Sequence, residues 1–463
     1  MKTRLNLFNM LSTILAMSMI LAACATAATP SEAPVTTEAA TQPSTAVPVA
    51  TEVPTKPAPP QPTEAPTEVP TEAAPVTITF WHAYNADTEG KYLDETIIPA
   101  FEASHPNIKI EAVNVPWDPF RRKLLIALSG GTAPDLARVD IAWTTELADT
   151  GALASLDDLM PDFATYKDTF LPGPLSTNLY QGKYYGLPLD TNTRVLAYNK
   201  AVFADAGIQN PPATIDEMLA DCAKIKALGT GVYCFADGGT YGWAVLPWIW
   251  EFGGALTDPG MTTSTGYYNS PETAAAYKFL KDGIDNGYFH PGMAGGGVDQ
   301  WGGLGKGEIA MILEGPWFPP AFSQQFPDVQ YGLAAVPAGT AGSISVVGGE
   351  DIVLFKQSAH KEEAMEFMRY MLSEEVQLEM LSVGQVPVLK SAIDSDTVKN
   401  HPYIGVFLEQ LKTAKARLPH PNWSKIETIV SNTGTAILSG QIDIQTGLDQ
   451  AVVEIDKLLP IQP

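Results

Sequence analysis

The chain has 463 residues and a formal charge of -24 at pH 7, with 52 acidic against 28 basic side chains. This excess of negative charge argues against nucleic acid or an anionic membrane surface as partners, because both are bound through basic patches. Beyond residue 75 the chain is long enough for two domains, each with a sizeable core.

Residues 1–24 have the pattern of a lipoprotein signal peptide. A basic start and a short apolar run lead to Leu21-Ala22-Ala23, directly before Cys24. Small residues before the cysteine are typical of a cleavage site, and the run is too short for a retained transmembrane helix. We expect Cys24 to be lipidated, so that acyl chains alone hold the protein at the outer face of the cell membrane or in the periplasm.

Residues 25–75 are expected to form a disordered tether. The segment consists almost entirely of Pro, Thr, Ala, Val and Glu, and it lacks Leu, Ile, Phe, Trp and Tyr. Such a composition cannot bury enough apolar surface to offset the entropy of ordering, and its prolines favour extended conformations.

Cys222 and Cys234 are the cysteines that remain after Cys24. An even pair in an oxidising compartment is compatible with a local disulfide. Cys222 also falls on the apolar face of a predicted helix, where it would pack equally well as a thiol. Both alternatives stay open from the sequence.

Strands alternate with helices at the start of the folded part. Apolar patterns predict strands at residues 76–81, 108–113 and 136–139, with helices between them at 92–104 and 120–128. This order builds an α/β fold with a parallel sheet and helices on both faces. Ligands bind such sheets beyond the carboxyl ends of the strands, which directs attention to residues 81–85, 117 and 140–143.

The second half carries its own helix signals. Thr214 opens a capping box, Ser270-Pro271 opens another helix, and residues 364–371 mark a third. Strand-like returns at residues 195–198, 309–313 and 352–355 are each able to carry the chain between two domains.

Motifs for catalysis are missing from the sequence. The six histidines have no metal-ligand spacing, and no nucleophile elbow, zinc helix or phosphate loop occurs. We therefore expect a protein that is not an enzyme and has no catalytic residue, metal or cofactor. The paired carboxylates Glu350-Asp351 and Asp157-Asp158 keep a surface glycosidase as an alternative, although adjacent acids are more typical of solvated turns.

Aromatic residues in glycine-rich loops are abundant instead. Examples are Tyr241-Gly242-Trp243, Gly315-Pro316-Trp317 and Asn422-Trp423. Flat rings flanked by carboxylates and amides match the C–H faces and hydroxyl groups of a sugar. Each tryptophan taken singly is also explained as a core residue.

A series of motifs in a fixed order resembles the family 1 extracellular solute-binding proteins of ABC importers, the carbohydrate-binding lipoproteins related to maltose-binding protein. Coverage runs from about residue 77 to the last helix. The matching motifs are Ile78-Thr79-Phe80-Trp81-His82, Pro106-Asn107-Ile108-Lys109-Ile110, Ser129-Gly130-Gly131-Thr132-Ala133-Pro134-Asp135, Gly151-Ala152-Leu153, Tyr185-Gly186-Leu187-Pro188, Leu196-Ala197-Tyr198-Asn199-Lys200, Pro211-Pro212-Ala213-Thr214, Gly307-Glu308-Ile309-Ala310-Met311, Glu314-Gly315-Pro316-Trp317 and Gly384-Gln385-Val386-Pro387.

The resemblance implies a periplasmic-binding-protein-like fold of class II, with two α/β lobes, hinge strands between them and a ligand cleft that closes. Lobe one would comprise residues 76–190 plus 310–355, and lobe two residues 191–309 plus 356–463. Carried over position by position, the ligand-binding residues would be Trp81, Asn85, Asp140, Trp143, Asn192, Trp248, Trp250, Glu251, Gly315, Trp317, Gly349, Asp351 and Trp423.

The implied function is a receptor that captures a mono- or oligosaccharide and delivers it to the transmembrane subunits of an ABC permease. We expect a monomer that binds neither nucleic acid nor, apart from its lipid anchor, the membrane.

Asn192 stands where maltose-binding protein has a carboxylate, which argues against maltodextrin as the ligand. A polyol, glycerol-phosphate or other non-sugar solute is the alternative ligand class, although a phosphate calls for basic groups and few stand near the cleft beyond Arg121, Arg138 and Arg194. A surface adhesin is a further alternative.

Overall fold

The computed structural model describes residues 75–229 and 231–460. The predicted signal peptide with Cys24 and the predicted tether up to residue 74 lie outside the described residues. Within the described ranges, no helix combines the length and the apolar character needed to cross a membrane.

The first sheet contains the parallel unit expected from the sequence. β1 (Val76–His82) lies between β2 (Ile108–Asn114) and β3 (Leu136–Asp140) and pairs in parallel with both. Late segments complete the sheet, because β11 (Val346–Leu354) pairs antiparallel with β3, and β6 (Leu187–Thr193) and β12 (Lys415–Ala416) both pair with β11. The three strands predicted first are confirmed to within one residue at their ends.

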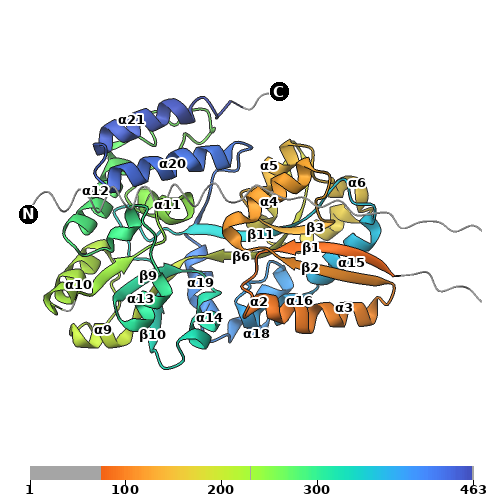
Figure 1. The fold of residues 1–463 in the computed structure, drawn as a ribbon, viewed down its shortest axis with the longest axis horizontal. Helices are drawn as coiled ribbons and strands as arrows, with labels where there is room; N and C mark the ends of the chain where they lie inside the picture. The colour runs from red at the N-terminus through yellow and green to blue at the C-terminus, as the bar shows by residue number, and fades with distance from the viewer. Residues whose placement is uncertain (1–74, 230, 461–463) are drawn as a thin grey trace, which may run out of the picture. The chain divides into compact units, whose positions relative to one another are not determined.

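Helices cover both faces of this sheet, as the βαβ pattern requires (Figure 1). On one face, Phe367 of α15 (Lys361–Met371) packs on Phe80 of β1, and Phe101 of α3 (Ile98–Ser104) packs on Phe367 in the same apolar cluster. On the other face, α4 (Trp117–Ser129) and α5 (Thr144–Asp149) supply Phe120 and Leu147 to a second cluster. The other helical segments on this side of the chain are α2 (Glu89–Tyr92), η1 (Leu93–Ile97), α6 (Leu156–Leu159), α7 (Phe163–Tyr166), η2 (Lys167–Thr169), α8 (Pro172–Ser176), α16 (Glu374–Met380), η4 (Leu381–Val383), α17 (Lys390–Ile393) and α18 (Asp396–Lys399), with a short hairpin of β4 (Leu179–Tyr180) and β5 (Lys183–Tyr184).

A second sheet has the order β10-β7-β9-β8. β7 (Val195–Asn199) is antiparallel to both β9 (Ile309–Glu314) and β10 (Tyr331–Ala334), and β8 (Tyr233–Ala236) is parallel to β9. The helices that follow it in the chain or pack beside it are α9 (Lys200–Asp205), α10 (Ile215–Ala227), α11 (Gly242–Glu251), α12 (Pro271–Asp285), η3 (Pro291–Ala294), α13 (Gln300–Lys306), α14 (Phe318–Gln325), α20 (Trp423–Leu438) and α21 (Ile444–Ile455).

Two of these helices begin at the predicted caps. The hydroxyl of Thr214 accepts a hydrogen bond from the backbone N–H of Glu217, and that of Ser270 accepts one from Thr273. Each bond satisfies one of the donors that a helix N-terminus leaves unpaired, which fixes where the helix starts.

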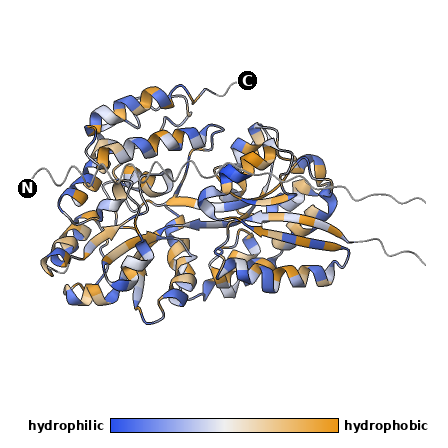
Figure 2. Cartoon of the chain, in the orientation of Figure 1, coloured by the Kyte–Doolittle hydropathy of each residue, from blue (hydrophilic) through white to orange (hydrophobic). Residues whose placement is uncertain are grey.

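The chain passes between the sheets through polar residues. β6 continues into β7 with Arg194 alone between them, and Figure 2 shows this crossing as hydrophilic. Beside it, the Ser345 hydroxyl donates to the backbone oxygen of Arg194 just before β11 begins. α19 (Ile404–Leu411) also packs against both β6 and β7.

The lobe boundaries that the strand pairings define differ from the predicted ones. Residues 310–355 were expected together in lobe one, but β9 and β10 pair within the second sheet and only β11 joins the first. Residues 356–463 were expected in lobe two, but α15 and α16 contribute their apolar residues to the core of the first sheet. The difference arises because strands pair with segments far away in the chain, which linear order along the chain does not reveal.

Cys222 and Cys234 form a disulfide that ties α10 to β8, with their Cα atoms 5.0 Å apart. Both residues are buried in the core of the second sheet. The bridge resolves the two alternatives that the sequence leaves open.

Replacing both cysteines with alanine should lower the free energy of unfolding by about 2–4 kcal/mol, because the bridge restrains the unfolded chain. Chemical denaturation followed by tryptophan fluorescence measures the change. The parent protein, reduced in denaturant and refolded in reductant, is the control and should match the variant. Equal stability of the variant and the oxidised parent would contradict the expectation.

Candidate functional site

One cavity of about 480 Å³ lies where the carboxyl ends of β1 and β3, the crossing segments and the loops of the second sheet meet. This is the edge at which ligands bind open α/β sheets. Its wall combines aromatic, acidic, basic and amide side chains. They are Trp117, Trp143, Tyr241, Trp243, Trp301 and Trp317; Glu89, Asp140, Glu314, Glu350 and Glu427; Arg138, Arg194 and Arg417; Asn85, Asn192 and Gln300; with Ala83, Leu313, Gly348 and Gly349.

Two stacked pairs of aromatic rings belong to the wall. Trp117, at the start of α4, stacks on Trp143, which follows β3, with ring centroids 5.3 Å apart. Trp243 of α11 stacks on Trp317, which follows β9, at 6.3 Å. Trp117 remains 41% exposed, so its ring faces space that another molecule can occupy. Flat, partly exposed rings of this kind bind the apolar faces of ligands.

Glycines allow the aromatic rings to approach the backbone. A Cβ atom on Gly348 of β11 would lie 2.4 Å from the Trp243 ring, and one on Gly315 would lie 2.2 Å from the Trp317 ring. Both distances are shorter than any real Cβ contact. The positions of these two tryptophans therefore depend on the glycines beneath them.

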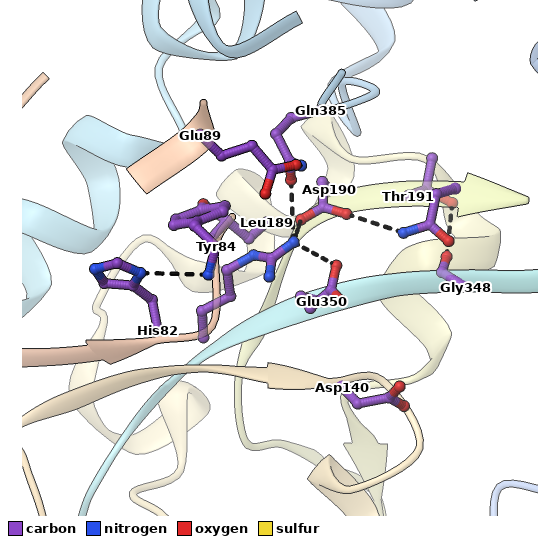
Figure 3. Close-up of polar contacts among 12 residues, drawn as sticks. His82, Tyr84, Glu89, Asp140, Leu189, Asp190, Thr191, Gly348, Glu350 and Gln385 are labelled. Carbon is purple, nitrogen blue, oxygen red and sulfur yellow. Dashed lines mark hydrogen bonds and ion pairs between the residues drawn. The ribbon is translucent and has the colours of Figure 1, made fainter. Parts of the chain in front are cut away.

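Arg138 is the buried centre of the polar wall. Its Nη2 atom donates to Glu350 at 2.6 Å and to Asp190 and Gln385 at 3.1 Å, and Figure 3 shows these three side chains converging on one guanidinium. Its carbon Cζ also lies 4.1 Å from the centre of the Tyr84 ring. One cation thus links strands β3, β6 and β11 to the loop after η4.

The other two cavity arginines are also paired. Arg194 donates to the carboxylate of Asp237 and to the backbone oxygen of Leu313. Arg417 donates to Asp140 at 2.7 Å. Because ion pairs occupy each guanidinium, the arginines shape the wall without leaving an unneutralised positive charge in it.

Burial raises the pKa of the Glu89, Glu314, Glu350 and Glu427 carboxyls. For Glu350, the charge of Arg138 opposes the effect of burial. Carboxyls in such surroundings, whether ionised or protonated, are hydrogen-bonding partners for hydroxyl or ammonium groups.

Six of the residues predicted at the site lie at the cavity. They come from the segment after β1, from the last residue of β3 and the segment after it, from β6, from the segment after β9 and from β11, and they are Asn85, Asp140, Trp143, Asn192, Trp317 and Gly349. Trp81 is half-buried on β1 and packs against the core, and Gly315 supports the Trp317 ring.

The other predicted residues are buried away from the cavity wall. Trp248, Trp250 and Glu251 belong to α11, which is apolar nearly all round and lies within the core. Trp423 is fully buried beneath Gly242 at the start of α20. Asp351 is also fully buried, and it accepts hydrogen bonds from Thr144, Thr177 and Asn178, which oppose the rise of its pKa by burial to about 7. These five positions are therefore not among the residues that line the cavity.

Several cavity residues are not predicted by any motif. Trp301, Arg417 and Glu427 lie in segments without a recognised pattern. Tyr241 and Trp243 belong to the aromatic motif Tyr241-Gly242-Trp243, which the sequence indicates as a sugar-binding loop, but the structure places Trp243 in the first turn of α11.

The chain matches the family model described as bacterial extracellular solute-binding protein over residues 85–378. A putative binding protein of Brucella abortus is 32% identical over 386 residues, which span 81% of this chain and 91% of that protein.

Two solved structures share the fold. The GacH receptor of Streptomyces glaucescens, solved without ligand and with acarbose, has a TM-score of 0.76 at 26% identity and covers 84% of this chain and 99% of its own. An ABC transporter solute-binding protein of Thermotoga lettingae, bound with α-D-tagatose, has the same TM-score and identity and covers 83% of this chain and 100% of its own. The α/β fold with two lobes and strands crossing between them is therefore established. Because the family model spans more than half of its residues, the chain belongs to the bacterial extracellular solute-binding proteins.

Proposed function

We propose that the protein is the extracytoplasmic receptor of an ABC transporter and captures a mono- or oligosaccharide in the cavity described above. The observation that carries this proposal is the combination of six aromatic rings with carboxyl and amide groups around about 480 Å³ of space. Sugar rings present C–H groups that pack on aromatic faces and hydroxyls that need acceptors and donors. The similar proteins named with acarbose and tagatose support the same ligand class.

A phosphate-bearing solute fits this wall less well. Five carboxyls line the cavity against three arginines, and each arginine already binds a carboxylate. An anion would have to displace an internal ion pair in order to reach a guanidinium, and it would leave a buried carboxylate without its partner.

The protein is proposed to act by binding and release. Closure of the two lobes around the sugar would signal occupancy to the permease subunits. Residues 76–190 with β11 and α15–α16 would move against the elements of the second sheet, with the crossing at Arg194 as one hinge. Lipidation at Cys24 would keep the receptor near the permease while residues 25–75 provide reach.

A thermal-shift screen across a carbohydrate panel tests the proposal directly. A sugar that binds only the folded state raises the melting temperature, and calorimetry then gives its affinity. Chromatography should recover the sugar unchanged. Formation of a product would favour a glycosidase instead, and a panel without a single binder would remove carbohydrate as the ligand class.

Replacing Trp317 with alanine should weaken sugar binding by about 1–3 kcal/mol, roughly tenfold to a hundredfold or more in Kd, with little change in melting temperature. Trp423→Ala is the matched comparison, because this tryptophan is buried in the core. We expect it to destabilise the fold by about 3–5 kcal/mol. Calorimetry and melting curves separate the two effects, and the opposite assignment would place the ligand near Trp423.

Ligand binding should reduce the radius of gyration measured by small-angle X-ray scattering, because the lobes approach each other on closure. A non-binding sugar from the same panel serves as the control. Tight binding with an unchanged radius would contradict closure.

Replacing Cys24 with serine should release the protein into the soluble extracytoplasmic fraction while sugar affinity stays the same, since lipid anchor and cavity are separate. Cell fractionation and calorimetry measure the two outcomes. A variant that remains with the membrane would show that something other than the acyl chains holds the protein there.

A further inference from the structure

The charges of the cavity wall do not balance. The wall contains five carboxyls and three arginines, and the arginines form ion pairs with two of those five, Glu350 and Asp140. Arg194 pairs with Asp237, which lies outside the wall. Glu89, Glu314 and Glu427 therefore have no cationic nitrogen within 4.0 Å among the residues that the structure describes.

The three remaining carboxyls differ in their neutral partners. Glu89 accepts hydrogen bonds at both oxygens, from the backbone of Asn85 and from Gln385. Glu314 accepts one from the indole N–H of Trp301 at 2.8 Å and a longer one from the backbone of Gly315 at 3.3 Å.

Glu427 has the most capacity left. Among the described residues it accepts one hydrogen bond, at Oε1 from the backbone of Gly242 at 3.1 Å, which leaves Oε2 without a donor. An ionised carboxylate has about four acceptor positions, so Glu427 can bind a further donor from a ligand.

Aromatic rings stand beside this carboxyl. Gly242, which binds Glu427, is flanked in the chain by Tyr241 and Trp243, and both line the cavity. Trp243 in turn stacks on Trp317, three residues after Glu314. Carboxylates combined with aromatic faces are the groups that bind an organic ammonium, through charge-assisted hydrogen bonds and cation–π attraction.

A ligand with only neutral hydroxyl groups does not require more carboxyls than arginines in the cavity wall. An unpaired carboxylate in a closed cleft has lost its hydration, and a neutral sugar compensates only the hydrogen bonds and not the charge. Burial raises the pKa of both Glu314 and Glu427 although arginines are near, which indicates that the internal cations do not fully compensate these carboxyls.

We propose that the sugar carried by this receptor bears a protonated amine, which lies against Glu427 and Glu314 between the rings of Tyr241, Trp243 and Trp317. The inference rests on the proposed function, because it assigns a chemical class to the sugar that the same cavity would hold.

Calorimetry on the full-length chain near neutral pH, with matched sugars, tests the proposal. The pairs are glucosamine and glucose, galactosamine and galactose, and the chitosan disaccharide and cellobiose. The members of the first two pairs differ in one ammonium against one hydroxyl group, and those of the third pair differ in two. N-acetylglucosamine is added as a neutral nitrogen control. We expect the amine of at least one pair to bind tenfold or more tightly than its hydroxyl partner and than the acetylated sugar.

Glutamine variants test where in the cavity the amine binds. Glu427→Gln and Glu314→Gln keep the shape of the side chain and remove its charge, so each should lower the ratio of amine affinity to hydroxyl-partner affinity by about tenfold. Glu362→Gln on the exposed surface of α15 is the matched control and should change neither affinity.

The outcomes separate the two proposals. If hydroxyl sugars bind as tightly as the amines or more tightly, the cationic ligand is excluded while the sugar receptor stands. If the amine is preferred but both glutamine variants keep that preference, its assigned position is excluded. If the folded protein binds no member of any pair and no other carbohydrate of the panel, the proposed function itself fails.

Discussion

The burial of one guanidinium among carboxylates is the constraint on which the cavity depends. Arg138 is buried on β3, and a buried cation is tolerated only when its charge and its hydrogen bonds are compensated. Asp190 and Glu350 provide this compensation from the two strands that lead toward the second sheet. Removing one partner of such a cluster typically costs about 3–5 kcal/mol, so the strands are held in register by the same group that forms the wall of the site.

The irregularity of the sheet lies at the same place. The pairing of β11 with β6 shifts in register between Glu350 and Asp351. A bulge of this kind redirects side chains and increases the local twist. Glu350 lies in the cavity wall while Asp351 is enclosed by hydroxyl and amide donors, so two adjacent acids have different surroundings and different roles.

The local parts of the fold could be predicted from the sequence, and the non-local parts only through a resemblance. The strands at residues 76–81, 108–113 and 136–139 follow from apolar patterns, and the caps at Thr214 and Ser270 from short polar side chains. Asp140 and Trp143 at the cavity follow from their place at and after the carboxyl end of a parallel strand. Which sheet β9, β10 and β11 would join could not be predicted, because they pair with strands that lie far away in the chain.

The tryptophans show that the sequence alone also does not determine the role of a single residue. Trp317 follows Gly315-Pro316 and Trp423 follows Asn422, yet one lines the cavity and the other is fully buried. Composition and spacing do not separate a stacking ring from a core ring, since both are large apolar groups near a chain turn. Arg417 and Glu427 have no sequence signal, because their part in the site depends on the docking of a C-terminal segment against β3 and α11.

The ion pair between Arg138 and Glu350 joins residues 212 positions apart. The first sheet is therefore incomplete until β11 exists, and the second sheet lacks β9 and β10 until the chain has passed residue 334. Pairing strands that are far apart in the chain has a large entropic cost of loop closure. This cost arises before the contacts stabilise the folded state, and it slows folding. The order of elements thus prevents either sheet from being completed until most of the polypeptide is present.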